Sequence, residues 1–162
     1  MRNKHILPMD DEAHPQPTEI DMTETRYLPL AGRLLIGLPF VFFGLAKAAT
    51  FAKTVALVEM VGIPLPLFGA IGAITLEVGG GLLLALGYKV RPIAVLLAIF
   101  TMVTAYYFHS NLADENTMVH FFKNVMMTGG LLQVVAFGAG SLSLDAYLSR
   151  RSGAASQVAF AN

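Results

Sequence analysis

The sequence predicts an all-α integral membrane protein: a four-helix bundle with a short amphipathic interfacial helix between its first two spanning helices. Of its 162 residues, 55% are hydrophobic and only 14% are charged, with a mean hydropathy of +0.61. In soluble domains about a quarter of the residues are charged. Nine of the charged residues fall within residues 1–26, so the rest of the chain is more apolar still. Such a composition is typical of a protein that crosses a membrane.

The first 26 residues are predicted to be a disordered, polar and acidic tail on the cytoplasmic side. They contain six acidic residues, the three prolines Pro8, Pro15 and Pro17, and few large apolar side chains. Such a segment cannot bury enough apolar surface to offset the entropy lost on ordering.

Four later runs are long and apolar enough to cross a bilayer. Crossing the hydrocarbon takes about 20 residues, with about 17 to 25 observed. Lipid offers no hydrogen-bond partner to backbone amides, so each run should be helical. The four predicted spans are residues 27–46, 63–88, 92–108 and 125–144.

Between the first two spans the sequence predicts the short amphipathic helix. Phe51, Val55 and Val58 recur at helical spacing, while Lys53 and Glu59 supply charge between them. A helix of this kind lies along the membrane interface.

The distribution of basic residues predicts that both chain termini are cytoplasmic, because lysine and arginine in short loops favour that side. Three lysines fall on the outer side, and seven basic residues fall on the inner side. The seven are Arg2, Lys4, Arg26, Lys89, Arg91, Arg150 and Arg151. Residues 149–162 are then a cytoplasmic C-terminal tail.

Two charged residues, Arg33 and Glu77, lie inside predicted spans. Ionisable groups there are costly, so they face the bundle interior and mark either a function or an internal pair. From the helical rise, an arginine side chain can bridge the difference in depth between the two. We therefore predict an Arg33–Glu77 pair. It is either a catalytic pair that handles protons or quinone, or an ion pair that locks the helices together.

The outer helix ends carry a second group of polar residues, Lys47, His109, Lys123 and Asn124. If the bundle closes, these four form a ligand site for a quinone head group, because cationic donors stabilise charge that develops on its carbonyl oxygens. The alternative is that they are interfacial residues whose side chains extend to water. Nearby histidine and acidic residues match no metal-ligand spacing, so no metal site is predicted.

Several short segments occur in the order found in one known family. They are residues 33–37 (RLLIG), 43–47 (FGLAK) followed by Phe51, 62–64 (GIP), Glu77 with Gly80 and Gly81, the turn 89–91, Lys123-Asn124 and residues 142–145 (LSLD). This ordered set resembles the DoxX family of small four-helix bacterial membrane proteins over residues 27–148. The chain departs from the family pattern at Phe43, where a serine often precedes the glycine, and in its long acidic tail.

The resemblance implies a multi-pass protein of the bacterial inner membrane. It also implies a quinone-interacting membrane subunit of an oxidoreductase, since some family members pass electrons from sulfur compounds to quinone. The chain has no Cys and so no thiolate redox centre of its own. Whether it is itself an enzyme is left open, and electrons would come from a soluble or membrane oxidoreductase subunit.

The alternative is a non-enzymatic membrane protein, either a small-solute permease or a scaffold for a partner subunit. Four helices make a small transporter, which suggests a homodimer in that case. A net charge of zero without a basic stripe argues against a nucleic-acid partner. In both hypotheses the lipid bilayer is the surrounding medium.

The predicted topology can be tested with reporter fusions. A fusion after Asn162 should report a cytoplasmic location, and a fusion at Asn116 should report the opposite side, because of the seven-to-three distribution of basic residues. The reverse pattern would overturn the predicted orientation.

Overall fold

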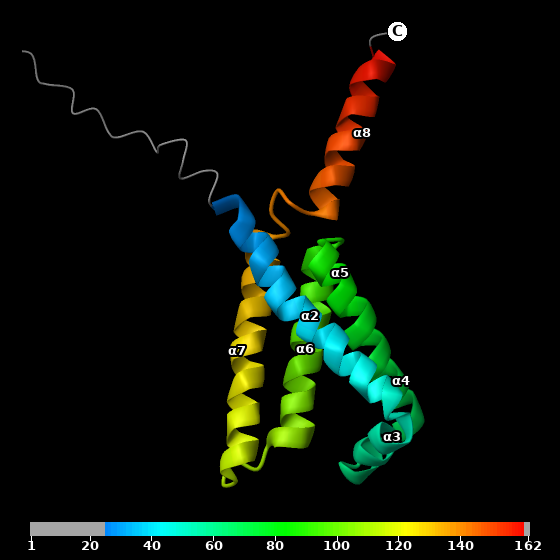
Figure 1. Cartoon of the computed structure of the whole chain (residues 1–162), viewed down its shortest axis with the longest axis vertical. Helices are drawn as coiled ribbons and strands as arrows, with labels where there is room; N and C mark the ends of the chain where they lie inside the picture. The colour runs from blue at the N-terminus through cyan, green and yellow to red at the C-terminus, as the bar shows by residue number, and fades with distance from the viewer. Residues whose placement is uncertain (1–24, 161–162) are drawn as a thin grey trace, which may run out of the picture.

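The computed structural model describes residues 25–160, and every regular element in that range is a helix, as the sequence predicts (Figure 1). The tail predicted for residues 1–26 lies outside the described residues except for its last two. A short 3-10 helix, η1 (Thr25–Tyr27), leads directly into α2 (Leu28–Ala49).

Three helical segments are long and apolar enough to cross a membrane, namely Leu28–Ala49, Pro66–Leu86 and Val90–His109. The first is α2 and the third is α6 (Val90–His109). The second consists of three consecutive helices: α4 (Pro66–Thr75), the π-helix η2 (Leu76–Gly80) and α5 (Gly81–Leu86). These three segments correspond to the first three predicted spans.

The fourth predicted span, residues 125–144, differs from the helix in the structure. Helix α7 covers Glu115–Phe137 and is not among the three spanning segments, because its first half carries several polar side chains. It begins early because the Asp114 carboxylate accepts hydrogen bonds from the backbone N–H and hydroxyl of Thr117, at 2.8 and 2.7 Å. These bonds lower the pKa of Asp114. The helix ends where Gly138 adopts a φ of 80°.

Two further helices lie outside the three spanning segments. Helix α3 (Phe51–Met60) occupies the position predicted for the amphipathic helix, whose place at the interface stays a prediction. Helix α8 (Leu144–Phe160) begins before the predicted C-terminal tail, residues 149–162, and continues through most of it. Figure 1 shows α8 extending beyond the end of the bundle.

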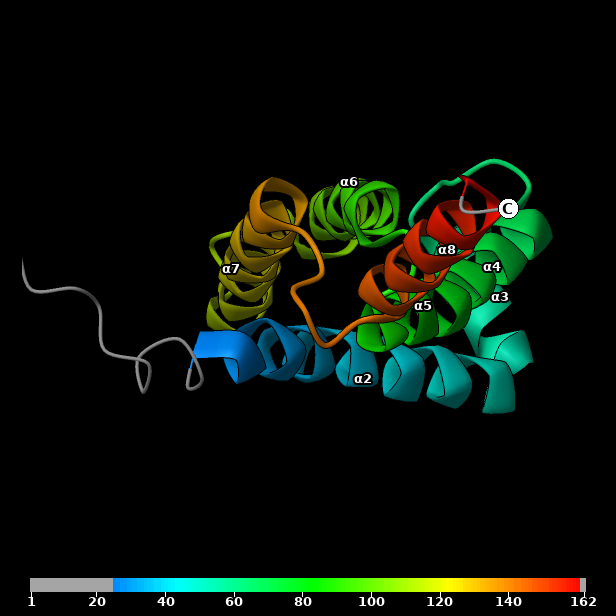
Figure 2. The same cartoon turned by 90° about the horizontal axis from the view of Figure 1, so that it is seen from above.

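The core lies where α2, α5, α6 and α7 meet. Phe40, Leu84, Leu97 and Leu131 are buried there, one from each of these helices. In the view from above, α2 runs along one side of the other helices, from α7 to α4 and α3 (Figure 2). Helices α6 and α7 pack side by side.

Helix α2 approaches the second spanning segment closely because glycines face each other. A Cβ atom on Gly37 would lie 2.7 Å from the carbonyl oxygen of Gly81, and a Cβ atom on Gly81 would lie 2.7 Å from the carbonyl oxygen of Gly37. Small residues let the backbones of membrane helices pack at such short range. This contact fixes the register of α2 against α5.

Gly37→Ala should therefore lower the free energy of unfolding by about 1 to 3 kcal/mol, since the atoms that the new methyl group meets are backbone atoms. Gly32→Ala on the same helix is the matched control, because nothing lies within 4 Å of its added Cβ. We expect the free energy of unfolding of this control to be unchanged or to rise by up to about 1 kcal/mol, because alanine has a higher helix propensity than glycine. Thermal unfolding in mild detergent measures both, and equal stabilities would contradict the close contact.

Candidate functional site

The candidate site is built around Glu77, a buried carboxylate within the second spanning segment. The residue is 5% exposed, and its Oε1 atom pairs with the Lys47 ammonium at the end of α2. In the part of the chain that the structure describes, this is the one salt bridge. A buried charge of this kind needs such a partner, because leaving it alone in an apolar environment is costly.

The local backbone of Glu77 is unusual. The residue lies in η2, a single π-helical turn between two α-helices. Such turns insert an extra residue into an α-helix and are frequent at functional sites. After Val78, glycines occupy positions 79–81, and Leu97 of α6 packs against Gly80. The π-helical turn therefore sets the direction in which the Glu77 side chain points.

Gly44 of α2 gives Lys47 access to the carboxylate. A Cβ atom on Gly44 would lie 2.9 Å from the Glu77 Cβ and 2.7 Å from a methyl carbon of Val78. Only a glycine allows α2 to pass η2 at this distance. Because residues three apart lie on the same face of a helix, Lys47 lies on the face of α2 that contacts Glu77 through Gly44.

The Lys47 end of the pair is held by α3. The Thr54 hydroxyl donates to the backbone carbonyls of Lys47 and Thr50, at 3.1 and 3.2 Å. The Lys47 side chain is 38% exposed, whereas that of Glu77 is 6% exposed. The ion pair thus links the surface at the end of α2 to the bundle interior.

One carboxylate oxygen of Glu77 has no partner. Its Oε2 atom is buried and accepts no hydrogen bond from any residue that the structure describes. An unsatisfied buried acceptor costs about 1 to 3 kcal/mol and calls for a specific explanation. This oxygen can take a proton or accept a hydrogen bond while Lys47 stays on the other oxygen.

The predicted Arg33–Glu77 pair is wrong. Arg33 is 1% exposed, but its guanidinium donates to the carbonyls of Leu84, Ala85 and Leu142, the first two at 3.3 and 3.0 Å. It thereby neutralises the C-terminal end of α5, where carbonyls lack helical partners. The glycine contact between α2 and α5 explains the error, since it sets Arg33 beside the end of α5 and Glu77 beside Gly44.

The predicted ligand group, Lys47 with His109, Lys123 and Asn124, is divided between two places. The His109 ring stacks on the ring of His120 across α6 and α7, with centroids 5.1 Å apart. Lys123 is exposed and Asn124 is half-buried, both on α7. Figures 1 and 2 place the C-terminal end of α2 beside α3 and α4, away from the turn between α6 and α7.

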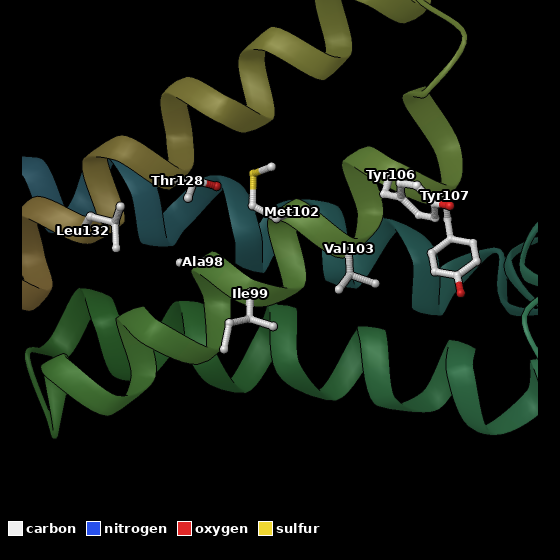
Figure 3. A pocket seen from close by; sticks show the side chains of 8 residues that line it. All are labelled: Ala98, Ile99, Met102, Val103, Tyr106, Tyr107, Thr128 and Leu132. Atoms are coloured by element: carbon white, nitrogen blue, oxygen red, sulfur yellow. The ribbon is translucent and has the colours of Figure 1, made fainter.

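A groove of about 470 Å³ lies between α6 and α7, a feature that was not predicted (Figure 3). Its lining residues are Ala98, Ile99, Met102, Val103, Tyr106, Tyr107, Thr128 and Leu132. The Thr128 hydroxyl oxygen is buried and has no hydrogen-bond partner within the described residues. The adjacent tyrosines of the third span, Tyr106 and Tyr107, are visible in the sequence, but whether they line one groove with Thr128 depends on how α6 and α7 pack.

Comparison with known proteins places these residues in a family context. The family model described as DoxX matches residues 28–110, which include Arg33, Lys47, Glu77 and His109 but neither Lys123 nor Asn124. No solved structure matches the chain.

Three curated relatives are similar to most of this chain. Inner membrane protein YqjF of Escherichia coli is 36% identical over 125 residues, covering 75% of this chain and 92% of its own length. Inner membrane protein YphA of the same organism is 36% identical over 123 residues, covering 73% and 88%. ER-derived vesicles protein ERV29 of Saccharomyces cerevisiae is 32% identical over 124 residues, covering 74% of this chain and 33% of its own length.

The Lys47–Glu77 pair predicts an asymmetric double-mutant cycle. Lys47→Met should lower the free energy of unfolding by about 3 to 5 kcal/mol, because it leaves a buried carboxylate without a partner. Glu77→Gln should cost less, since the half-exposed Lys47 can extend to water. The double variant should recover part of the loss. Thermal unfolding in mild detergent provides the measurement.

Lys53→Met and Glu59→Gln are the matched controls, because both residues are exposed on α3. Arg33→Gln combined with Glu77→Gln should be additive within about 0.5 kcal/mol, as expected for residues that share no contact. Additivity of the Lys47 and Glu77 changes would show that these two residues do not interact.

Proposed function

Because this chain belongs to the DoxX family, we propose that it is a multi-pass protein of the bacterial inner membrane and the quinone-interacting membrane subunit of an oxidoreductase system. Three segments have the length and hydropathy to cross a bilayer. The two Escherichia coli relatives are named as inner membrane proteins. Both facts support the proposed location.

The observation that carries the proposed activity is the buried carboxylate with one free oxygen. The chemistry that a bound quinone supplies is the uptake of two electrons and two protons. The Glu77 Oε2 atom has no partner among the described residues, so it can hold a proton for transfer to a ligand oxygen. Residues with a burial and a charge partner like those of Glu77 are frequent at functional sites.

Lys47 contributes in two ways to this proposed site. Its ammonium balances the Glu77 charge, and it is a cationic donor able to stabilise negative charge that develops on a ligand oxygen. Because its side chain is 38% exposed, protons can enter from the surface at the end of α2 and reach the buried carboxylate through the pair.

The groove between α6 and α7 suits the apolar part of a quinone. It is lined by aliphatic and aromatic side chains, and the hydroxyl of its lining residue Thr128 is buried behind them. Electrons would come from a partner subunit, and the absence of Cys excludes a thiolate-ligated redox centre in this chain.

Quinone binding by the full chain, purified in mild detergent, tests the proposal. Glu77→Gln and Lys47→Met should each raise the Kd for a soluble ubiquinone analogue at least tenfold, because removing a charged hydrogen-bonding group costs about 1.5 to 3 kcal/mol. Glu59→Gln and Lys53→Met should leave the Kd unchanged. Folding of each variant is checked by its elution in size-exclusion chromatography.

Unchanged quinone affinity in both site variants would contradict the proposal. The non-enzymatic alternative, a permease or a scaffold, would then be favoured. Liposomes that contain the pure protein would take up solute if it is a permease and would not if it is a scaffold.

A further inference from the structure

Among the side chains that the structure describes, those at the beginning of helix α8 join it to the bundle. The Asp145 carboxylate accepts hydrogen bonds from the backbone N–H groups of Lys89 and Val90, at 2.9 and 3.3 Å, and its own N–H donates to Gly87. The Arg150 guanidinium donates to the carbonyl of Ser141 at 3.0 Å. Of the described side chains, Arg150 is the last in α8 that bonds to the bundle.

The described part of α8 presents an uncovered apolar face. Leu144, Tyr147 and Leu148 are 37%, 56% and 43% exposed and recur at the spacing of one helix face. Arg151 falls one turn further on the same face, and Ser149 falls on the opposite face. The helix therefore pairs an apolar face with adjacent cationic groups, which is the pattern of helices that lie on membrane surfaces.

The charges of the described residues are unevenly distributed between the two ends of the bundle. The start of α2, the turn between α5 and α6, and α8 meet at one end (Figure 1). Five exposed basic residues belong to these elements, namely Arg26, Lys89, Arg91, Arg150 and Arg151. The one acidic residue there, Asp145, is already hydrogen-bonded to backbone N–H groups.

The opposite end carries exposed charges of both signs. Glu59 and Lys53 lie on α3, Asp114 and Glu115 lie at the turn between α6 and α7, and Lys123 lies further along α7. Among the described residues, the end that bears α8 therefore has the net excess of exposed basic side chains, which makes it complementary to an anionic surface. Anionic lipid attracts clusters of lysine and arginine beside membrane helices.

We propose that α8 binds the anionic surface of the bilayer at this end of the bundle, with Leu144, Tyr147 and Leu148 in the acyl boundary and Arg150 and Arg151 on lipid phosphates. In the structure α8 extends past the bundle, and the segment that joins it to α7 contains Gly138 and Gly140, both at positive φ. Rotation about this segment lays α8 along the bilayer, and it breaks the hydrogen bonds that Asp145 makes to the turn between α5 and α6.

The absence of Cys from the chain makes a direct test simple. Leu148→Cys and Ser149→Cys variants of the full chain, each with a spin label, are reconstituted into vesicles of phosphatidylcholine alone or mixed with phosphatidylglycerol. We expect the label at position 148 to be shielded from a water-soluble relaxation agent only in the anionic vesicles. The label at position 149 is the matched control and should stay accessible in both.

Adding Arg150→Gln and Arg151→Gln to the Leu148→Cys protein should shift the ratio of bound to free α8 roughly 30-fold toward the free state. Arg151→Gln alone should give roughly a fivefold shift, and it leaves the Arg150 hydrogen bonds intact.

Equal accessibility of position 148 in the two kinds of vesicle would overturn the proposal. Shielding in neutral vesicles that is lost in an Asp10→Asn, Asp11→Asn, Glu12→Gln variant would also overturn it. That result would identify the acidic N-terminal segment, rather than lipid, as the occupant of this surface.

Discussion

The buried carboxylate of Glu77 is the constraint on which the rest of the structure depends. An unpaired charge inside an apolar bundle costs several kcal/mol, so the fold has to bring a cation to it. Lys47 reaches Glu77 only because Gly44 lets α2 pass close to the π-helix. The glycine contact between Gly37 and Gly81 holds the same two segments in register further along. Close helix packing and charge compensation are therefore two aspects of a single arrangement.

The two buried charges of the described residues are compensated in different ways. Arg33 donates to two carbonyls at the end of α5 and to one in the loop before α8, while its buried Nε atom has no hydrogen-bond partner among these residues. Glu77 has a partner at one oxygen and none at the other. The two unpartnered atoms differ in their chemistry, because a carboxylate oxygen can take up a proton whereas a guanidinium keeps its protons. The free oxygen is what supports a role in proton transfer.

Apolar runs were enough to predict three spanning helices and to single out Arg33 and Glu77 as buried charges. Their partners were not predictable, because these depend on the register of α2 against the second span and on the π-helical turn at Glu77. The prediction of one site containing Lys47 and His109 did not anticipate their separation for a related reason, because residues at the same depth can lie on different sides of a bundle. The early start of α7 depends on the Asp114 cap, which the apolar pattern does not reveal.

The ionisation state of Glu77 in the membrane tests the central claim most directly. Infrared difference spectroscopy of the reconstituted protein, with Glu77→Gln as the reference, isolates the bands of this one side chain. We predict carboxylate bands at neutral pH in the wild-type protein and a carboxylic-acid carbonyl band in Lys47→Met, because Lys47 keeps the buried group ionised. A carboxylic-acid band in the wild-type protein, or no change in Lys47→Met, would contradict this account.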